Sequence, residues 1–192
     1  MDGFVFFARP WWVNLLIFVP FAVAVFWRRR LEIGQKTLLV GAIFGVAFGF
    51  VEAAVVVYIR GAAGMLAECA TKLPDGIFSF DMYRQSQLLS QLPKYFLTIE
   101  MYRESATIIM LICVAWLAVS RWRERWAMLF WTFAWWDLFY YVGLKLAIDW
   151  PERFTTADVL FLLPVPWLAQ VWLPIFISST FVLIIFFSCR KA

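Results

Sequence analysis

The chain has 192 residues, of which 64% are hydrophobic and 16% are charged, and its mean hydropathy is +0.80. Soluble globular domains carry about 25% charged residues, so this composition excludes an ordinary soluble domain and predicts a polytopic integral membrane protein. The net charge is +4, but the basic residues cluster at the ends of apolar runs, where they orient a membrane protein. Nucleic-acid binding is therefore not predicted.

The chain contains no histidine. This excludes His-ligated haem, His-containing zinc or iron sites, and Ser–His or Cys–His catalytic pairs. The three cysteines, Cys69, Cys113 and Cys189, have no metal-ligand spacing and indicate no disulfide framework. A Gly-rich phosphate loop, a serine nucleophile elbow and a zinc-protease motif are also absent from the sequence.

The first predicted span covers about residues 11–27. It begins at the interfacial pair Trp11 and Trp12 and ends before Arg28–Arg30, a charge pattern typical of a membrane helix. Pro20 is expected to kink this helix, because proline cannot donate a backbone hydrogen bond.

The second predicted span covers about residues 37–59 and carries a face of small residues. Gly41, Gly45 and Gly49 recur every four residues, a pattern that lets a second helix approach closely. Glu52 continues the same face one turn later. We therefore expect its carboxylate to point into the bundle, away from lipid.

The third predicted span, about residues 97–120, follows an outer loop at 61–96 in which Met82–Tyr95 has the spacing of a short amphipathic helix. Glu100 and Glu104 are four residues apart and share one helix face, and Arg103 lies one turn from Glu100. Ionisable groups at the mouth of a membrane span are costly, which makes them a functional-site hypothesis by default.

The fourth predicted span, about residues 126–148, is rich in aromatic residues and has Asp137 in its middle. Tyr140 and Tyr141 follow three and four residues later, on the same face. A proline-rich connection then leads to a fifth span at about 167–187, and its prolines favour an interfacial or re-entrant segment. The predicted fold is an all-α bundle of about five transmembrane helices that forms one domain.

The basic ends of the spans predict the orientation. Placing them on the cytoplasmic side of a bacterial-type inner membrane puts the N-terminus outside and the C-terminus inside. Glu52 and Glu104 then each lie about seven residues, or roughly 10 Å, below the outer surface. The ionisable residues within the spans thus gather in the outer halves and predict one polar site that opens outward.

Three roles are predicted for the residues of this site. The candidate catalytic residues are Glu52, Glu104, Asp137, Tyr140 and Tyr141. The candidate substrate-binding residues are Arg60, Arg103, Lys145, Trp136 and Asp158, with Arg60 and Arg103 as anchors for an anionic head group. The candidate ligands of a divalent metal ion (Mg²⁺, Mn²⁺ or Ca²⁺) are Glu52, Glu100, Glu104 and Asp137.

The predicted function is a membrane enzyme that performs acid–base or metal-assisted chemistry on a lipid-soluble or membrane-delivered substrate. Three alternatives remain open. The charged residues can form structural ion pairs. The carboxylates can serve a proton-coupled or cation transporter, although the chain lacks an evident internal repeat. The chain can also be an accessory subunit. The expected partners are membrane lipids and a lipid-soluble small molecule, with a homo-oligomer or larger complex formed through the Gly41, Gly45 and Gly49 face or the aromatic surface.

Overall fold

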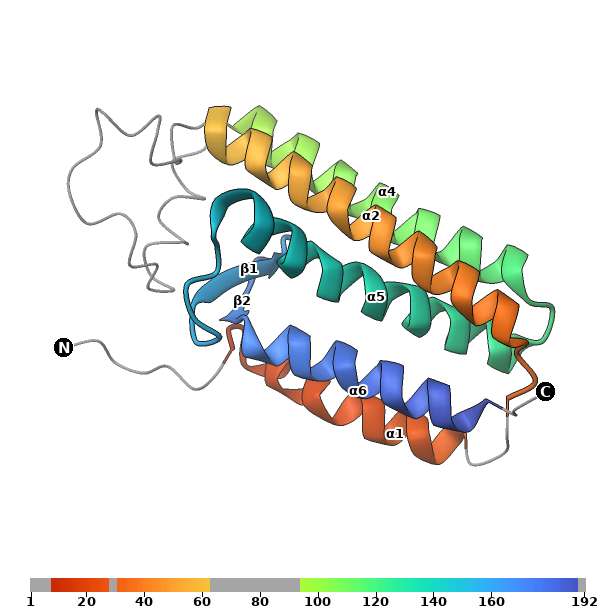
Figure 1. Cartoon of the computed structure of the whole chain (residues 1–192). Coiled ribbons are helices and arrows are strands. Elements are labelled where there is room, and N and C mark those ends of the chain that lie inside the picture. Colours follow the sequence, from red (N-terminus) through yellow and green to blue (C-terminus); the bar gives the residue numbers. More distant parts are fainter. Residues whose placement is uncertain (1–7, 28–30, 63–93, 190–192) are drawn as a thin grey trace.

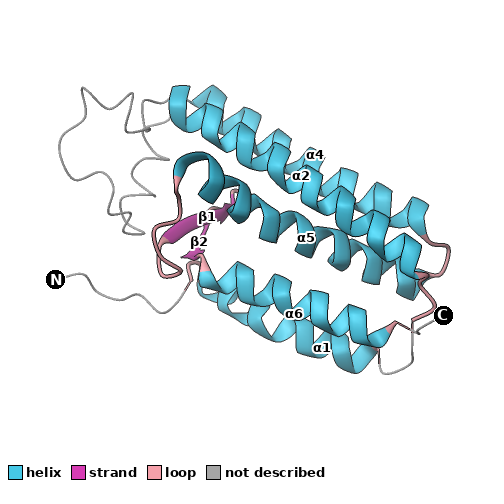
Figure 2. Ribbon diagram, viewed as in Figure 1, coloured by secondary structure: helices cyan, strands magenta, loops and turns pink. Residues whose placement is uncertain are grey.

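The structure, a computed structural model, describes residues 8–27, 31–62 and 94–189, and most of these residues are helical (Figure 2). The predicted amphipathic helix at Met82–Tyr95 lies outside the described residues except for its last two positions, which belong to helix α4. The helices are η1 (Trp11–Phe18), α1 (Val19–Phe26), α2 (Gln35–Ala62), α4 (Lys94–Ala118), α5 (Trp122–Ile148) and α6 (Trp172–Ser188). The strands are β1 (Ala157–Phe161) and β2 (Trp167–Gln170).

The predicted helical class is therefore confirmed in the main, with two corrections. The connection before the last helix forms an antiparallel hairpin in which Ala157 pairs with Gln170, so α6 begins at Trp172 and not at Trp167. Pro164 and Pro166 separate the strands and cannot donate helical hydrogen bonds, and the flanking apolar residues favour extended structure.

The second correction concerns the predicted first span. It is not one regular helix, because η1 is a 3₁₀ helix that changes to the α-helix α1 at Val19. Pro20 stands at the start of α1, where its missing N–H costs little, whereas within a continuous α-helix it would leave a carbonyl unpaired.

Helix α5 lies in the middle of the molecule, with α2 and α4 on one side and α1 and α6 on the other (Figure 1). Its most extensive packing is against α2. The predicted close approach of the glycine face is confirmed, and its partner is α5. A Cβ atom at Gly45 would lie 2.6 Å from Cβ of Trp135 and 2.7 Å from the carbonyl oxygen of Thr132. Within the chain this face is therefore covered by α5.

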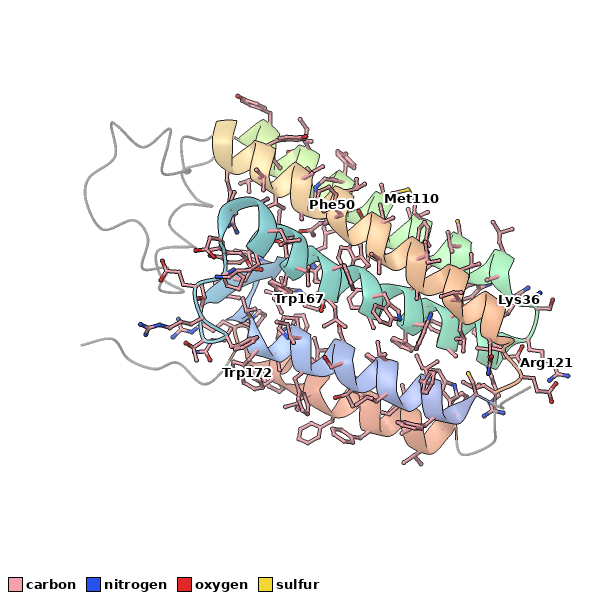
Figure 3. All side chains as sticks on the ribbon, viewed as in Figure 1. Lys36, Phe50, Met110, Arg121, Trp167 and Trp172 are labelled. Atoms are coloured by element: carbon pink, nitrogen blue, oxygen red, sulfur yellow. The ribbon has the colours of Figure 1, made fainter. Side chains whose placement is uncertain are left out.

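A hydrophobic core fills the end of the bundle that lies away from the hairpin. Trp27, Leu38, Met128 and Ile185 are buried there, and the indole N–H of Trp131 donates a 2.8 Å hydrogen bond to the Leu38 carbonyl. Lys36 and Arg121 lie at this end, whereas Trp167 and Trp172 lie at the other (Figure 3). The two ends of the bundle thus differ. One end is filled by packed apolar residues with basic residues beside them, and the other end is covered by the hairpin.

Two helical segments among the described residues are long and apolar enough to cross a membrane, Gln35–Gly61 and Leu97–Ala118. The apolar helical segments Trp11–Phe26 and Trp172–Ser188 are shorter. Helix α5 has 27 residues, but it carries charged side chains near both ends and Asp137 in its middle.

The β1–β2 hairpin binds the segment before η1 and follows α5 in the chain. Arg9 and Leu168 exchange two backbone hydrogen bonds of 2.8 and 2.7 Å, which ties the segment before η1 to β2. Helix α5 ends at Asp149, whose φ of 53° is left-handed and reverses the chain toward β1. Aspartate tolerates this conformation better than most residues do. The hairpin therefore covers the end of the bundle where the predicted polar residues lie.

Candidate functional site

A cavity of about 790 Å³ lies beneath the hairpin and between helices α2, α4, α5 and α6. Its polar lining residues are Glu52, Arg60, Glu100, Arg103, Glu104, Ser105, Thr107, Asp137, Tyr140, Tyr141, Asp158 and Ser178. Trp136 lines it as well. Of the ten residues predicted to act in catalysis or substrate binding, the structure thus brings all but Lys145 to one cavity.

Lys145 does not line this cavity and is engaged at the end of α5. Its Nζ lies 2.7 Å from Oδ1 of Asp149 and donates hydrogen bonds to the carbonyls of Asp149 and Pro151. Basic side chains in the last helical turn commonly bind the free carbonyls there. Substrate binding by Lys145 is therefore not supported by its position.

Arg103 is the electrostatic centre of the wall formed by α2 and α4. Its Nη1 pairs with Oε1 of Glu52, and its Nη2 lies 2.6 Å from Oε2 of Glu100. The Arg103 Nε also donates to Glu100 over 2.9 Å, and the Thr107 hydroxyl lies 3.5 Å from the second oxygen of Glu52. One guanidinium thus compensates two carboxylates, which supports the structural ion-pair alternative for these three residues.

The same geometry bears on the predicted metal site. No group of three or more His, Cys, Asp or Glu side chains in residues 8–27, 31–62 and 94–189 is arranged to hold a metal ion. Arg103 occupies the position between Glu52 and Glu100 in which a cation would have to bind both. In the described residues it is therefore the Arg103 guanidinium that compensates Glu52 and Glu100.

Glu104 lies one turn after Glu100 on α4. Its carboxylate binds the hairpin and does not pair with Arg103. The backbone N–H of Leu162 donates to both of its carboxylate oxygens, over 3.1 and 2.9 Å. Leu162 follows directly after β1, so this contact fixes the hairpin against α4. Hydrogen bonds from a backbone N–H to a carboxylate are stronger than those between neutral groups.

Asp137 of α5 is a buried carboxylate of the cavity and has no cationic partner among the described residues. It is 8% exposed, and its Oδ2 accepts a 2.7 Å hydrogen bond from the hydroxyl of Ser178, which is 1% exposed. Sequence reasoning missed Ser178. The polar run Ser178–Thr180 inside an otherwise apolar helix is the pattern that points to it, because a buried hydroxyl needs a partner.

Asp158 forms a second pair with a neutral donor at the hairpin. It is 3% exposed, and the hydroxyl of Tyr141 donates to its Oδ2 over 3.0 Å. Burial raises the pKa of this carboxyl from its ordinary value near 3.8 to about 6, against the opposing influence of Arg60 and of the Tyr141 hydrogen bond. Asp158 therefore favours its neutral form in the folded protein more than in the unfolded chain.

A pH dependence of stability follows from this pKa. Between about pH 4 and pH 6 the folded protein retains the Asp158 proton that the unfolded chain releases, so the free energy of unfolding falls as pH rises through this window. The loss from this residue is about 2–3 kcal/mol. Thermal unfolding of the purified protein at pH 4.5 and pH 7 measures it, and Asp158→Asn should lose less stability over this interval. An equal loss in both proteins would contradict the assignment.

Arg60 and Tyr140 present donors that are not committed to other groups. The Arg60 guanidinium carbon lies 4.1 Å from the ring centroid of Trp150, and Arg60 forms no ion pair with any residue that the structure describes. The Tyr140 hydroxyl has no hydrogen-bond partner within the same residues. It lines the cavity from α5 and lies within electrostatic range of Arg60, Arg103 and Asp158.

The deeper part of the cavity is apolar. Leu129, Phe130, Ile177 and Phe181 line it, and Phe130 stacks on Phe181 with ring centroids 4.6 Å apart.

Comparison of the chain with protein-family models, curated proteins and solved structures gave no match. What the cavity can do therefore follows from its own residues: one wall offers carboxyl, hydroxyl and guanidinium groups, and the other offers hydrocarbon and aromatic surface.

Proposed function

We propose that the chain is an integral membrane protein whose five helical segments, η1–α1, α2, α4, α5 and α6, cross a bacterial-type cytoplasmic membrane. The hairpin end then faces the extracytoplasmic side, with the N-terminus outside and the C-terminus inside. The basic residues at the opposite end, such as Lys36 and Arg121, support this orientation.

The outward-facing side chains support a membrane environment. Large apolar residues are exposed along the outer faces of several helices, and they include Phe21, Phe26, Leu39, Ile43, Phe50, Ile109, Leu117, Leu183 and Phe187. Monomeric soluble proteins rarely expose contiguous apolar surfaces of this extent, whereas lipid chains cover such surfaces without cost.

We further propose that the cavity performs acid–base chemistry on a lipid-soluble substrate. The observation that carries this proposal is the position of Asp137, a buried carboxyl group without a cationic partner among the described residues, on the boundary between the polar and apolar walls of a 790 Å³ cavity. A cavity of this size accommodates a substantial small molecule. Ile109 of α4 lines the cavity and is 58% exposed, which supports entry from the side, out of the bilayer.

In this mechanism Asp137 exchanges a proton with the bound substrate, and Ser178 positions the carboxyl group by its 2.7 Å hydrogen bond. Tyr140 supplies a hydroxyl that can donate to an oxygen of the substrate as charge develops there. Arg103 positions the carboxylates of Glu52 and Glu100 on the cavity wall, because these two groups occupy its donors.

Transport of a proton or a cation is the second candidate, and accessory membership of a larger complex is the third. Cation binding is favoured by three carboxylates that have no cationic partner within the described part of the chain, those of Glu104, Asp137 and Asp158. The packed core at the other end of the bundle, which contains Trp131 and Met128, leaves no continuation of the cavity across the described helices. A site that opens to one side suits an enzyme or a binding protein better than a transporter.

The Asp137→Asn variant tests the proposed chemistry. Molecules that copurify with the protein in a mild detergent, or that bind from an extract of the host membrane, are identified by mass spectrometry and then incubated with the protein. When saturated with these molecules, Asp137→Asn should convert them at least about 100-fold more slowly than the natural protein, whatever the change in affinity, because about 100-fold is the usual contribution of general acid–base catalysis.

Two further variants serve as controls. Asp149→Asn changes an exposed aspartate that directly follows α5 and does not line the cavity, and it should leave conversion unchanged. Ile177→Trp fills the apolar half of the cavity and should abolish binding while the fold persists. Unchanged conversion by folded Asp137→Asn, or undiminished binding by Ile177→Trp, would contradict the proposal.

A further inference from the structure

The uncommitted groups in the cavity carry both signs of charge. Arg103 is already engaged by two carboxylates, whereas Arg60 has no carboxylate within ion-pair distance among the described residues. Among the acidic groups, Asp137 and Asp158 are at least nine-tenths buried. Their side-chain partners are the neutral hydroxyls of Ser178 and Tyr141. Both kinds of group line one cavity.

A ligand with a single charge fits this arrangement poorly. An anion that binds Arg60 would also meet carboxylates that lack a cationic partner in the described structure, namely those of Glu104, Asp137 and Asp158. A cation that binds these carboxylates would leave Arg60 unpaired. Burying an uncompensated charge is costly, so a site of this kind discriminates against either ligand.

We propose that the cavity binds a zwitterionic amphiphile, with its anionic group at Arg60 and Tyr140 and its ammonium group at Asp137 and Asp158. This inference rests on the proposed function and specifies its substrate class. A phosphate-like group matches the guanidinium and hydroxyl donors. The ammonium group supplies the positive charge that the two carboxyl groups lack, and Trp136, Tyr140 and Tyr141 provide aromatic surface beside it.

Trp136 offers a donor to a ligand that bears an acceptor oxygen, although the buried indole N–H groups of Trp27, Trp135 and Trp150, which do not line the cavity, also lack a partner among the described residues. The Trp136 side chain lines the cavity and is 6% exposed, yet its indole N–H has no hydrogen-bond partner among the described residues. A buried donor of this kind normally has an acceptor. An ester or phosphate oxygen of the amphiphile would provide one.

The apolar half of the cavity accounts for the hydrocarbon part of the ligand. Leu16 of η1, Val19 of α1 and Phe181 of α6 line it, on the side of α5 away from the Arg103 cluster. A chain that follows these side chains from the head group buries its methylene groups, which adds hydrophobic binding energy in proportion to its length.

Three lipids with identical acyl chains test the head-group assignment: phosphatidylethanolamine (zwitterionic), phosphatidylglycerol (anionic) and diacyl trimethylammonium propane (cationic). Their binding to the purified full chain in a neutral sugar detergent is measured by native mass spectrometry. We expect phosphatidylethanolamine to bind at least about tenfold more tightly than either singly charged lipid, a difference of about 1.4 kcal/mol.

The variants assign the two charges to their residues. Asp158→Asn should remove the preference for phosphatidylethanolamine over phosphatidylglycerol, and Arg60→Gln should remove its preference over the cationic lipid. The exposed residues Asp149 and Arg153 lie outside the cavity at the same end of the molecule, so Asp149→Asn and Arg153→Gln should keep both preferences.

Each result that contradicts the inference has a distinct meaning. Equal or tighter binding of phosphatidylglycerol, or of the cationic lipid, overturns the zwitterionic assignment. Equal binding of all three lipids, unchanged in both variants, also overturns it, while the conversion assay with Asp137→Asn still tests the proposed function by itself. If no lipid binds more tightly to the natural protein than to Ile177→Trp, the inference fails, and failure of the conversion assay shows separately whether the acid–base proposal fails with it.

Discussion

Arg103→Gln is expected to lower the stability of the protein more than any other single exchange of a charged residue in the cavity. It leaves Glu52 and Glu100 without their shared cation, and these side chains are only 10% and 15% exposed. Removing one partner of a buried ion pair costs about 3–5 kcal/mol. For a chain of this length the melting temperature should fall by about 6–20 °C, which thermal unfolding in detergent measures.

The Arg121→Gln variant is the matched control for this experiment. Arg121 pairs with Glu32, and these two side chains are 63% and 59% exposed. Its Nη1 also lies 3.6 Å from the buried Glu124, which keeps the hydrogen bond from the Glu32 backbone N–H when Arg121 is replaced, so the loss should stay within about 1 kcal/mol. Adding Glu52→Gln and Glu100→Gln to Arg103→Gln should recover part of the lost stability, because no buried charge of this cluster then remains unpaired. If the single variant Arg103→Gln is as stable as Arg121→Gln, Arg103 does not compensate the buried charges of Glu52 and Glu100, and the prediction is wrong.

Gly45→Ala should both destabilise the bundle and weaken ligand binding. The added methyl group would lie 2.6 Å from Cβ of Trp135 and 2.7 Å from the Thr132 carbonyl oxygen, and a backbone atom cannot rotate away. Overpacking of this kind typically costs about 1–3 kcal/mol. Because the forced separation of α2 and α5 displaces the helix that carries Asp137 and Tyr140, the affinity for lipid should decrease in parallel.

The position of the glycine decides the outcome of this test. A methyl group added at Gly34 would meet only Oγ1 of Thr37, at 4.0 Å, so Gly34→Ala should leave both stability and affinity unchanged. Thermal unfolding and the lipid titration are measured on both variants. Equal behaviour of Gly34→Ala and Gly45→Ala would show that α2 and α5 are not in such close contact.

The residues of the cavity could be predicted because ionisable side chains are conspicuous in apolar helices. The spacing of Glu100, Arg103 and Glu104 places them on adjacent parts of one helix surface, and the glycine repeat indicates which face of α2 packs, and thus where Glu52 points. Helical periodicity and the cost of burying charge were sufficient to expect these groups in one site.

The partners of these groups could not be predicted in the same way. Glu104 binds the backbone N–H of Leu162, and a backbone donor carries no sequence pattern. The strand pairing of Ala157 with Gln170 depends on tertiary contacts, because a short apolar run fits a strand or a helix equally well. The contacts of Lys145 could not be foreseen either, because its neighbour Asp149 reverses the chain and brings competing carbonyls into reach.

The backbone contacts between distant parts of the chain imply an order of assembly during synthesis. Arg9 pairs with Leu168, and Leu31 donates a hydrogen bond to Ser188, so the segments around the first helix cannot close before the ribosome has made nearly the whole chain. Such long-range pairings form late, since a large loop must close first. Asp137 consequently acquires Ser178, and Glu104 acquires Leu162, only at the final stage. A nascent chain interrupted before α6 would hold Asp137 without the hydroxyl of Ser178 that donates to it in the complete fold.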